Sequence, residues 1–346
     1  MSASPRNVPE GSLLADDHFL REVAQLYYEM EETQEDIAKK LFCSRQTIGK
    51  ALQRAKDRNI IRITIVPEER KGFLQNLTRE LRIKLRLQDL VLVMGSNFDK
   101  RDPESIADGV LEDITTGAAE YLDQLLTDDT ILAVSGGKRF MRRVVRALKP
   151  TKVLSQLVVV PTIGFTRRRT NFGDSNLISY DIATAYGGKH EWLPIPAVVE
   201  TQEQREQAQA LPIARDVLQT IKKANVVMLG LWPSHGNEKL IEKEMLTQEQ
   251  ITSLESCNPV VDIDHWAFDE KGVCVNYQLD PPPYHLTGLE IPLLKESIRE
   301  NNTKVILVAG ASASYVPGIL SVLRAGIVNI LITDHITAGL LMEELN

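Results

Sequence analysis

Hydrogen-bonding and cationic side chains are concentrated in one short segment near the N-terminus of the chain. Residues 39–62 contain eight Lys and Arg residues and one acidic residue, Asp57. Arg and Lys suit the acceptors of guanine, Gln suits adenine, and the Thr methyl group can contact thymine, so this composition is typical of a surface that reads duplex DNA. Lys56 and Arg58 are expected to contact phosphates. The side chains predicted to contact bases are Arg45, Gln46, Thr47, Lys50 and Arg54.

A second group of polar residues lies in the C-terminal part of the chain. The run from Ser135 to Arg139 reads Ser-Gly-Gly-Lys-Arg and follows the apolar run Ile131–Val134. Backbone amides at a turn from a strand into a helix bind anions, so this turn is a candidate anion site. The run is neither a P-loop nor a GxGxxG fingerprint, and glycine pairs also form ordinary tight turns. The run can therefore be either a ligand-binding loop or an ordinary tight turn.

A neighbouring loop carries further cations. Thr162 and Gly164 follow the apolar run that ends at Pro161, and they precede a cluster made of Arg167, Arg168, Arg169 and Asn171. Two adjacent cationic loops predict a phosphate or carboxylate ligand. A solvated basic loop or a contact with another subunit is the alternative, and for Arg169 we favour it. Weaker candidates flank other apolar runs, namely Trp232, Ser234, His235, Asp262 and Asp264.

Three amphipathic helices must position the basic segment. Asp16 to Met30 has apolar residues at helical spacing, Thr33 can cap a short second helix, and Ser44 can cap a third helix that ends near Asn59. This order predicts a helix-turn-helix. The turn at Phe42 often requires positive φ, which costs Phe more than Gly. A three-helix bundle used for dimerisation is the alternative.

Alternation of apolar and polar residues over Ile60–Val66 predicts a strand beside the third helix, as in winged helix-turn-helix domains. A linker helix follows, and its narrow leucine stripe is consistent both with pairing to a second copy and with packing on the larger domain. From Asp89 onward, short apolar runs alternate with amphipathic helices, which predicts a doubly wound parallel sheet with ligands at the carboxyl ends of the strands. The predicted strands are 90–95, 131–135, 157–161, 226–231, 305–310 and 330–333.

Length and composition agree with this organisation. The 346 residues suggest two domains, and 43% hydrophobic and 25% charged residues exclude disordered, collagenous and disulfide-scaffold classes. The spacing of Cys43, Cys257 and Cys274 indicates neither a disulfide framework nor a metal site. Apolar runs are too short to cross a bilayer and no leader opens the chain, so we expect a cytoplasmic protein. The predicted boundaries are 1–66 for the DNA-binding domain, 67–88 for the linker helix and 89–346 for the α/β domain.

Several runs resemble one family of regulators. The segments Gln34–Leu41, Ser44–Ile48 and Ile60–Ile63 resemble the N-terminus of the SorC/DeoR-type sugar-responsive transcriptional regulators. Further similarity to the effector domain of that family lies in Asp129–Gly137, Phe268–Gly272 and Leu323–Asp334, followed by Thr337 and Ala338. Together the matching runs span nearly the whole chain.

The resemblance implies a bacterial regulator that assembles as a homodimer or homotetramer on double-stranded DNA, with a roughly palindromic operator. Its C-terminal domain would have a Rossmann-like α/β fold similar to sugar-phosphate isomerases and CoA-transferases. This domain would bind a sugar, polyol or sugar phosphate that alters DNA binding, and we expect no cofactor, metal or membrane partner. The residues predicted to contact the effector are Ser135, Gly136, Gly137, Lys138, Arg139, Thr162, Arg167, Asn171 and Asp264.

One departure from the family concerns the loop 309–315. The family commonly has a glycine pair and a following Lys that helps to hold phosphate, and this chain has no Lys there. Lys138 and Arg167 can substitute, so phosphorylated and unphosphorylated effectors both remain open. The alternative function is a sugar-phosphate isomerase or CoA-transferase-like enzyme with an accessory helix-turn-helix head, in which Asp262, Asp264 or Lys138 has an acid-base or Schiff-base role.

Overall fold

The computed structural model describes residues 10–58, 60–61, 68–95, 108–165, 173–233 and 247–345. The chain forms two compact units, Met1–Lys71 and Gly72–Asn346. The division between them falls within helix α5 (Glu68–Lys84). No helix among the described residues is long and apolar enough to span a membrane.

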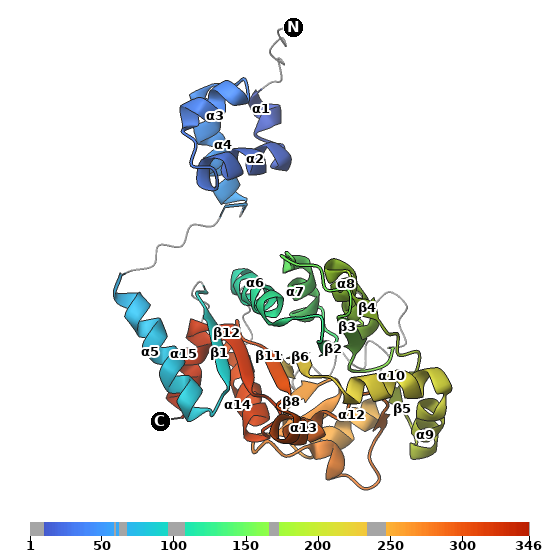
Figure 1. Cartoon of the computed structure of the whole chain (residues 1–346). Coiled ribbons are helices and arrows are strands. Elements are labelled where there is room, and N and C mark those ends of the chain that lie inside the picture. The colour runs from blue at the N-terminus through green and yellow to red at the C-terminus, as the bar shows by residue number, and fades with distance from the viewer. Residues whose placement is uncertain are drawn as a thin grey trace. The chain divides into compact units, whose positions relative to one another are not determined.

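The first unit is a small helical domain (Figure 1). Its helices are α1 (Glu10–Leu13), α2 (Asp17–Tyr28), α3 (Gln34–Lys40) and α4 (Arg45–Asp57). One apolar face of each of α2, α3 and α4 supplies the core, which consists of Phe19, Leu20, Val23, Ile37, Ala38, Ile48, Ala51, Leu52 and Ala55. The three predicted helices are confirmed, whereas α1 was not predicted.

Side-chain caps set where α3 and α4 begin. Thr33 Oγ1 accepts a hydrogen bond from the Asp36 amide at 3.2 Å, and Ser44 Oγ accepts one from the Thr47 amide at 3.0 Å. In the turn between these helices, Phe42 has a φ of 53° and an exposed side chain. The turn therefore needs the left-handed conformation predicted for it, at a cost of about 1–2 kcal/mol for a residue with a Cβ atom.

The predicted wing strand falls largely outside the described residues. Ile60 and Ile61 are described, and they form a bend in which both amides donate to the Ala55 carbonyl, at 2.8 and 3.1 Å. The bend follows the end of α4, and both side chains pack against the core of the helical unit. The rest of the expected strand, 62–66, lies outside the described ranges.

A seven-stranded parallel sheet organises the second unit, in the order β1-β12-β11-β6-β2-β3-β4 (Figure 1). All six predicted strands are present in this sheet, and its two-residue edge strand β4 was not predicted. The strands are β1 (Asp89–Val93), β2 (Ile131–Val134), β3 (Val158–Pro161), β4 (Lys189–His190), β6 (Val226–Gly230), β11 (Lys304–Val308) and β12 (Ile330–Asp334).

Helices cover both faces of this sheet. In Figure 1, α6, α7 and α8 lie on one face, and α10 and α13 lie on the other. Their bounds are α6 (Asp108–Leu125), α7 (Met141–Ala147), α8 (Ser175–Tyr186), α10 (Pro212–Lys222) and α13 (Leu294–Asn301). Further helices among the described residues are α9 (Gln202–Ala210), α12 (Gln248–Glu255), α14 (Val316–Arg324), α15 (His335–Glu344), η2 (Val275–Tyr277), η3 (Ile291–Leu293) and η4 (Ala313–Tyr315).

Two small antiparallel sheets are attached to the main sheet. One pairs β5 (Val198–Val199) with β10 (His285–Leu286). The other contains β7 (Trp232–Pro233), β8 (Pro259–Ile263) and β9 (Trp266–Asp269). Only Leu231 separates β7 from the end of the central strand β6, so this second sheet extends directly from the carboxyl edge of the main sheet.

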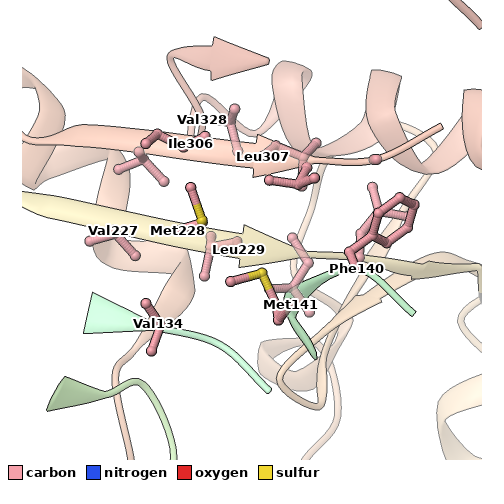
Figure 2. Close-up of a cluster of buried hydrophobic side chains, with 14 of the residues drawn as sticks. Val134, Phe140, Met141, Val227, Met228, Leu229, Ile306, Leu307 and Val328 are labelled. Carbon is pink, nitrogen blue, oxygen red and sulfur yellow. The ribbon is translucent and has the colours of Figure 1, made fainter. Parts of the chain in front are cut away.

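The core of the second unit lies along the three central strands. Figure 2 shows Val134 of β2, Met228 of β6 and Leu307 of β11 beside Phe140 and Met141. All five side chains are at most 3% exposed. The near-continuous apolar sequence of these strands follows from burial on both faces.

Helix α5 packs on the second unit. Leu77 and Leu81 belong to the same buried cluster as the sheet, and Leu85 packs against it. Of the two arrangements that the sequence left open for this stripe, packing on the larger domain is therefore the one observed. The C-terminal part of the linker helix is an integral part of the α/β unit.

Candidate functional site

The order of the strands reverses between β2 and β6. The strands that follow β2 in the chain, β3 and β4, lie on one side of it, whereas β11 and β12 follow β6 and lie on the other side. Ligands of open parallel sheets bind outside the carboxyl ends of the strands at such a reversal. The loops after β2, β3, β6 and β11 are therefore the loops that form the candidate effector site.

Ser135 lies at the reversal point and connects β2 to β6. Its Oγ accepts a hydrogen bond from the Gly230 amide at 3.0 Å, and its own amide donates to the Met228 carbonyl at 3.0 Å. The residue is fully buried. The contact of Ser135 with the effector stays a prediction, and in this structure its side chain joins the ends of β2 and β6.

The glycine pair is a close-packed turn whose amides are already bonded. The Gly137 amide donates to the Gly173 carbonyl at 2.8 Å, and the Gly136 amide donates to the Asp264 carboxylate. A Cβ atom on Gly136 would lie 2.7 Å from the Gly173 oxygen, and Gly137 has a φ of 133°. The expectation that these two amides bind an anion stays a prediction, and the glycines are needed for the turn itself.

Thr162 is buried beneath the site. Its hydroxyl group lies 3.1 Å from the Val134 carbonyl and is also hydrogen-bonded to the Asp264 carboxylate. The contact of Thr162 with the effector stays a prediction. In this structure the residue fixes the position of Asp264.

Asp264 is a half-buried carboxylate at the tip of the β8–β9 hairpin. Asp264 and His265 both have positive φ, 48° and 69°, as two-residue hairpin turns of the primed type require. Burial raises the pKa of Asp264 to about 6, against the opposing effect of the hydrogen bonds from Thr162 and from the Gly136 amide. The hairpin thus places a carboxylate between the loops after β2 and β3.

A second carboxylate, Asp262, lies two residues earlier on β8. It is paired across the small sheet with Trp232 and accepts a hydrogen bond from the His265 amide at 3.1 Å. Burial raises its pKa to about 7, the His265 hydrogen bond lowers it, and the neighbouring charge of Asp264 raises it. Burial, together with the short distance between the two groups, therefore disfavours simultaneous ionisation of Asp262 and Asp264.

Arg139 crosses the reversal point from β2 towards β11. Its Nη1 donates to Tyr315 Oη at 2.6 Å, and its guanidinium carbon lies 4.6 Å from the ring centroid of Trp232. Phe140 packs edge-on against the Tyr315 ring, with centroids 5.5 Å apart. The side chain of Arg139 is thereby held in one place at the edge of the site.

The structure thus brings together part of the predicted effector set. Lys138 and Arg139 follow β2, Lys138 with an exposed side chain, and Asp264 faces the same loop from the hairpin. Arg167 and Asn171 lie outside the described residues, as do Arg168, Arg169, Ser234 and His235.

Sequence reasoning missed Tyr315 and gave Trp232 only minor weight. Each lies just after a central strand, Trp232 two residues after β6 and Tyr315 in η4 after β11. The sequence signal for these two residues was therefore their position just after a predicted strand. Their interaction with Arg139 depends on the strand order, which no local pattern specifies.

In the helical unit, Arg45, Gln46, Lys50 and Arg54 are exposed on α4. Thr47 is only 5% exposed, and its hydroxyl group lies 2.8 Å from that of Ser44. The contact of Thr47 with a base stays a prediction. Arg58, expected at a phosphate, has its Nη1 donating to Asp17 Oδ1 at 2.6 Å and to the Ala15 carbonyl at 3.0 Å in this structure.

Comparison with known proteins gives consistent matches. Residues 70–343 match the family described as "Putative sugar-binding domain". The chain is 26% identical over 326 residues to the Deoxyribonucleoside regulator of Bacillus subtilis (strain 168), covering 94% of this chain and 97% of that protein. It is 23% identical over 334 residues to the Sorbitol operon regulator of Klebsiella pneumoniae, covering 95% and 98%.

Solved structures show the same fold. The full-length Sorbitol Operon Regulator SorC from Klebsiella pneumoniae superimposes with a TM-score of 0.64 at 22% identity, over 94% of this chain and 98% of that one. These relatives are transcriptional regulators, which does not support the enzyme alternative. The chain therefore belongs to the SorC/DeoR family of transcriptional regulators, with a C-terminal domain of the sugar-binding type that defines the family.

Proposed function

We propose that the protein binds an operator through α4 and that a sugar, polyol or sugar-phosphate effector at the carboxyl edge of the main sheet changes its affinity for that operator. The observation that carries the effector part is the convergence of the loops after β2, β3, β6 and β11 at the reversal of strand order. Carboxylates and cations both line this edge. Such a mixture suits a ligand rich in hydroxyl groups.

The charge distribution within the helical unit supports α4 as the DNA-contacting helix. On α3, Lys39 lies 3.6 Å from Glu35, and Lys40 pairs with Glu32. On α4, by contrast, four basic residues accompany one acidic residue. Arg45, Gln46 and Lys50 lie in its first two turns, where side chains of a recognition helix reach base edges.

On the effector side, Asp264 supplies acceptors for ligand hydroxyl groups, and Lys138 supplies a donor. Effector binding has an effect only if its affinity differs between two conformations of the protein. The β8–β9 hairpin is the element through which such a difference arises in this proposal. Its tip is hydrogen-bonded to the loops after β2 and β3, which a ligand would contact first.

We also propose a homodimer or homotetramer that acts in the cytoplasm on the chromosome. A single helix-turn-helix covers one half-site, and a symmetric pair predicts half-sites about one helical turn or a multiple apart. Sedimentation of the full chain with and without an operator fragment tests this assembly. A monomeric complex at saturation would contradict it.

The effector proposal is tested by a thermal-shift panel of sugars, polyols and their phosphates with the full chain. A specific ligand stabilises the folded state by mass action, and the same ligand should change the operator affinity in a fluorescence-anisotropy titration. A ligand that stabilises the protein without changing DNA binding would contradict the regulatory role.

A further inference from the structure

We infer that the edge strand β4 pairs antiparallel with β4 of a second copy of this chain, about a two-fold axis at His190. This inference rests on the homo-oligomer of the proposed function and deepens it by naming the surface. β4 is the last strand in the order of the main sheet, and Figure 1 shows it at that end, beside α8. Among the described residues, β4 pairs with β3 and with no other strand. Its outer side is therefore an open sheet edge, which is a template for another strand.

The backbone of β4 presents one donor and one acceptor on this outer edge. The Lys189 amide donates to the Leu157 carbonyl at 2.7 Å. The Glu191 amide donates to the Val159 carbonyl at 3.3 Å. Because successive residues of a strand direct their backbone groups to opposite edges, the N–H and C=O of His190 face away from β3. Two such residues that lie directly opposite in an antiparallel pair exchange both hydrogen bonds, so His190 is complementary to its own copy.

The same axis brings opposite charges together. It places Lys189 opposite the partner's Glu191, and Glu191 opposite the partner's Lys189, in the closer type of pair with Cα atoms about 4.5 Å apart. Lys189 is exposed, and its Nζ donates to the neutral Gln156 side chain at 2.6 Å. Within the described ranges neither Lys189 nor Glu191 has an ion-pair partner. Opposite charges across a strand pair stabilise it and like charges destabilise it, so the charges favour this register.

Exposed apolar side chains flank the open edge. Tyr180 of α8 and Trp192 each pack edge-on against the ring of His190, with centroids 5.6 Å apart. Tyr180 is 50% exposed and Trp192 is 44% exposed. Val153, which is 79% exposed, lies next to Gly187 just before β4. Aromatic rings supply much of the buried area of protein interfaces, so this surface can stabilise a contact whose paired strand is only two residues long.

The side chains that meet on the α8 side of β4 are also compatible. Continuing the register by one step places the partner's Trp192 opposite Gly188, where a Cβ atom would lie 2.8 Å from the Leu157 oxygen. Aromatic side chains cover glycines across antiparallel pairs in this way. Burial lowers the pKa of His190, against the opposing effect of its hydrogen bond to the Asn176 backbone. The two facing imidazoles are therefore neutral at pH 7 and do not repel each other.

Charge reversal on the full-length protein tests this pairing. Sedimentation velocity and light scattering measure the assembly of the wild type, Lys189→Glu, Glu191→Lys and the double variant Lys189→Glu/Glu191→Lys. The matched control is Lys295→Glu, at an exposed lysine of α13. Circular dichroism of each variant separates lost pairing from lost folding.

Each single variant places like charges opposite each other at both ends of the pair, and should raise the Kd of this contact roughly 10- to 100-fold. The assembly then falls by one step, from tetramer to dimer or from dimer to monomer. The double variant restores opposite charges and should assemble as the wild type does. An equimolar mixture of the two single variants should regain the larger assembly, because the mixed pair has opposite charges at both positions. Lys295→Glu should leave the assembly unchanged.

A second variant tests the apolar part of the surface. Trp192→Ala should weaken the contact roughly 10-fold or more, because it removes a half-exposed ring that the pairing would bury. Val273→Ala is its control, at a residue that is 46% exposed in the turn after β9. Equal assembly of Trp192→Ala and the wild type would contradict burial of this ring between the copies.

The possible failures are distinguishable. Unchanged assembly in both single charge variants would overturn the inference, leave the proposed homo-oligomer standing and leave the β4 edge open to a strand of another protein. Folded single variants that dissociate but do not recover on mixing or in the double variant would overturn the register. Equal losses in Lys189→Glu and Lys295→Glu would indicate a general effect of charge and would also overturn the inference. A wild type that is monomeric at every concentration would overturn both this pairing and the proposed homo-oligomer.

Discussion

The Gly230 amide donates a hydrogen bond to Ser135 Oγ at 3.0 Å, which ties the carboxyl ends of β2 and β6 together. This bond lies at the reversal of strand order, between the fully buried Ser135 and the partly buried Gly230. It places the start of the loop that carries Lys138 and Arg139 in a fixed relation to the strand that leads to Trp232.

Replacing Ser135 by Ala should therefore reduce stability. The Gly230 amide would lose its acceptor inside the protein, at a cost of about 1–3 kcal/mol. Chemical denaturation of the full chain measures this loss, and the exposed Ser155→Ala is the control with little expected effect. An unchanged free energy of unfolding in Ser135→Ala would contradict the structural role.

Replacing Arg45 or Lys50 by Ala should weaken operator binding by about 1–3 kcal/mol each, because each would remove hydrogen bonds to base edges. Fluorescence anisotropy at several salt concentrations measures the loss. Lys39→Ala on α3 is the matched control, since this lysine pairs with Glu35. Equal losses in all three variants would indicate a general electrostatic effect and not base recognition.

Phe42→Gly should stabilise the helical unit by roughly 0.5–1 kcal/mol. Phe42 adopts a φ of 53° with an exposed side chain. Glycine would remove the free-energy cost of this left-handed conformation, and we expect this gain to exceed the conformational entropy that glycine adds to the unfolded chain. Thermal unfolding of the full chain followed at the helical unit measures this change. Phe42→Ala keeps the Cβ atom and should give no such gain.

Gly136→Ala should destabilise the protein by about 1–3 kcal/mol and abolish effector binding, because a Cβ atom would meet the Gly173 carbonyl at 2.7 Å. Gly339→Ala is the control. It lies in α15 with open space around its Cβ position, and the substitution should be neutral or stabilising by up to about 1 kcal/mol. Normal ligand binding by Gly136→Ala would show that this turn is not part of the site.

The pKa of Asp262, raised to about 7, makes stability depend on pH. The folded state holds this proton more tightly than the unfolded chain, so the contribution is full below the ordinary Asp pKa and is lost as pH rises through about 7. Asp262→Asn should reduce the loss of stability between pH 5 and pH 8 by roughly 1–2 kcal/mol, a range lowered for partial solvent exposure. Parallel pH profiles for variant and wild type would contradict the raised pKa.

Local patterns were sufficient for most of the fold. Thr33 and Ser44 marked the starts of α3 and α4, and continuous apolar runs marked the strands of the sheet. The two-residue strand β4 and the four-residue helix α1 were missed, because such short segments have no periodicity to detect.

Less of the candidate effector site than of the fold could be predicted from the sequence. Lys138, Arg139 and Asp264 were identified as candidates, since cations and carboxylates after apolar runs are visible in the sequence. Whether a polar group faces a ligand or a neighbouring strand depends on tertiary contacts, and the hydrogen bonds that hold Ser135, Thr162 and Thr47 within the protein could not be predicted from local patterns. The interaction of Arg139 with Tyr315 joins residues 176 positions apart, and only the strand order brings them together.

A single residue joins β7 to β6, so the small sheet that carries Asp264 is a direct extension of a central strand. The hairpin carrying Asp264 projects beyond the main sheet and contributes no strand to it. Its residues nevertheless belong to the interior, because Ile263 is fully buried and Asp264 is hydrogen-bonded to Thr162 and to the Gly136 amide. A substitution at 262–265 is therefore expected to move the starts of the loops after β2 and β3 together with the hairpin.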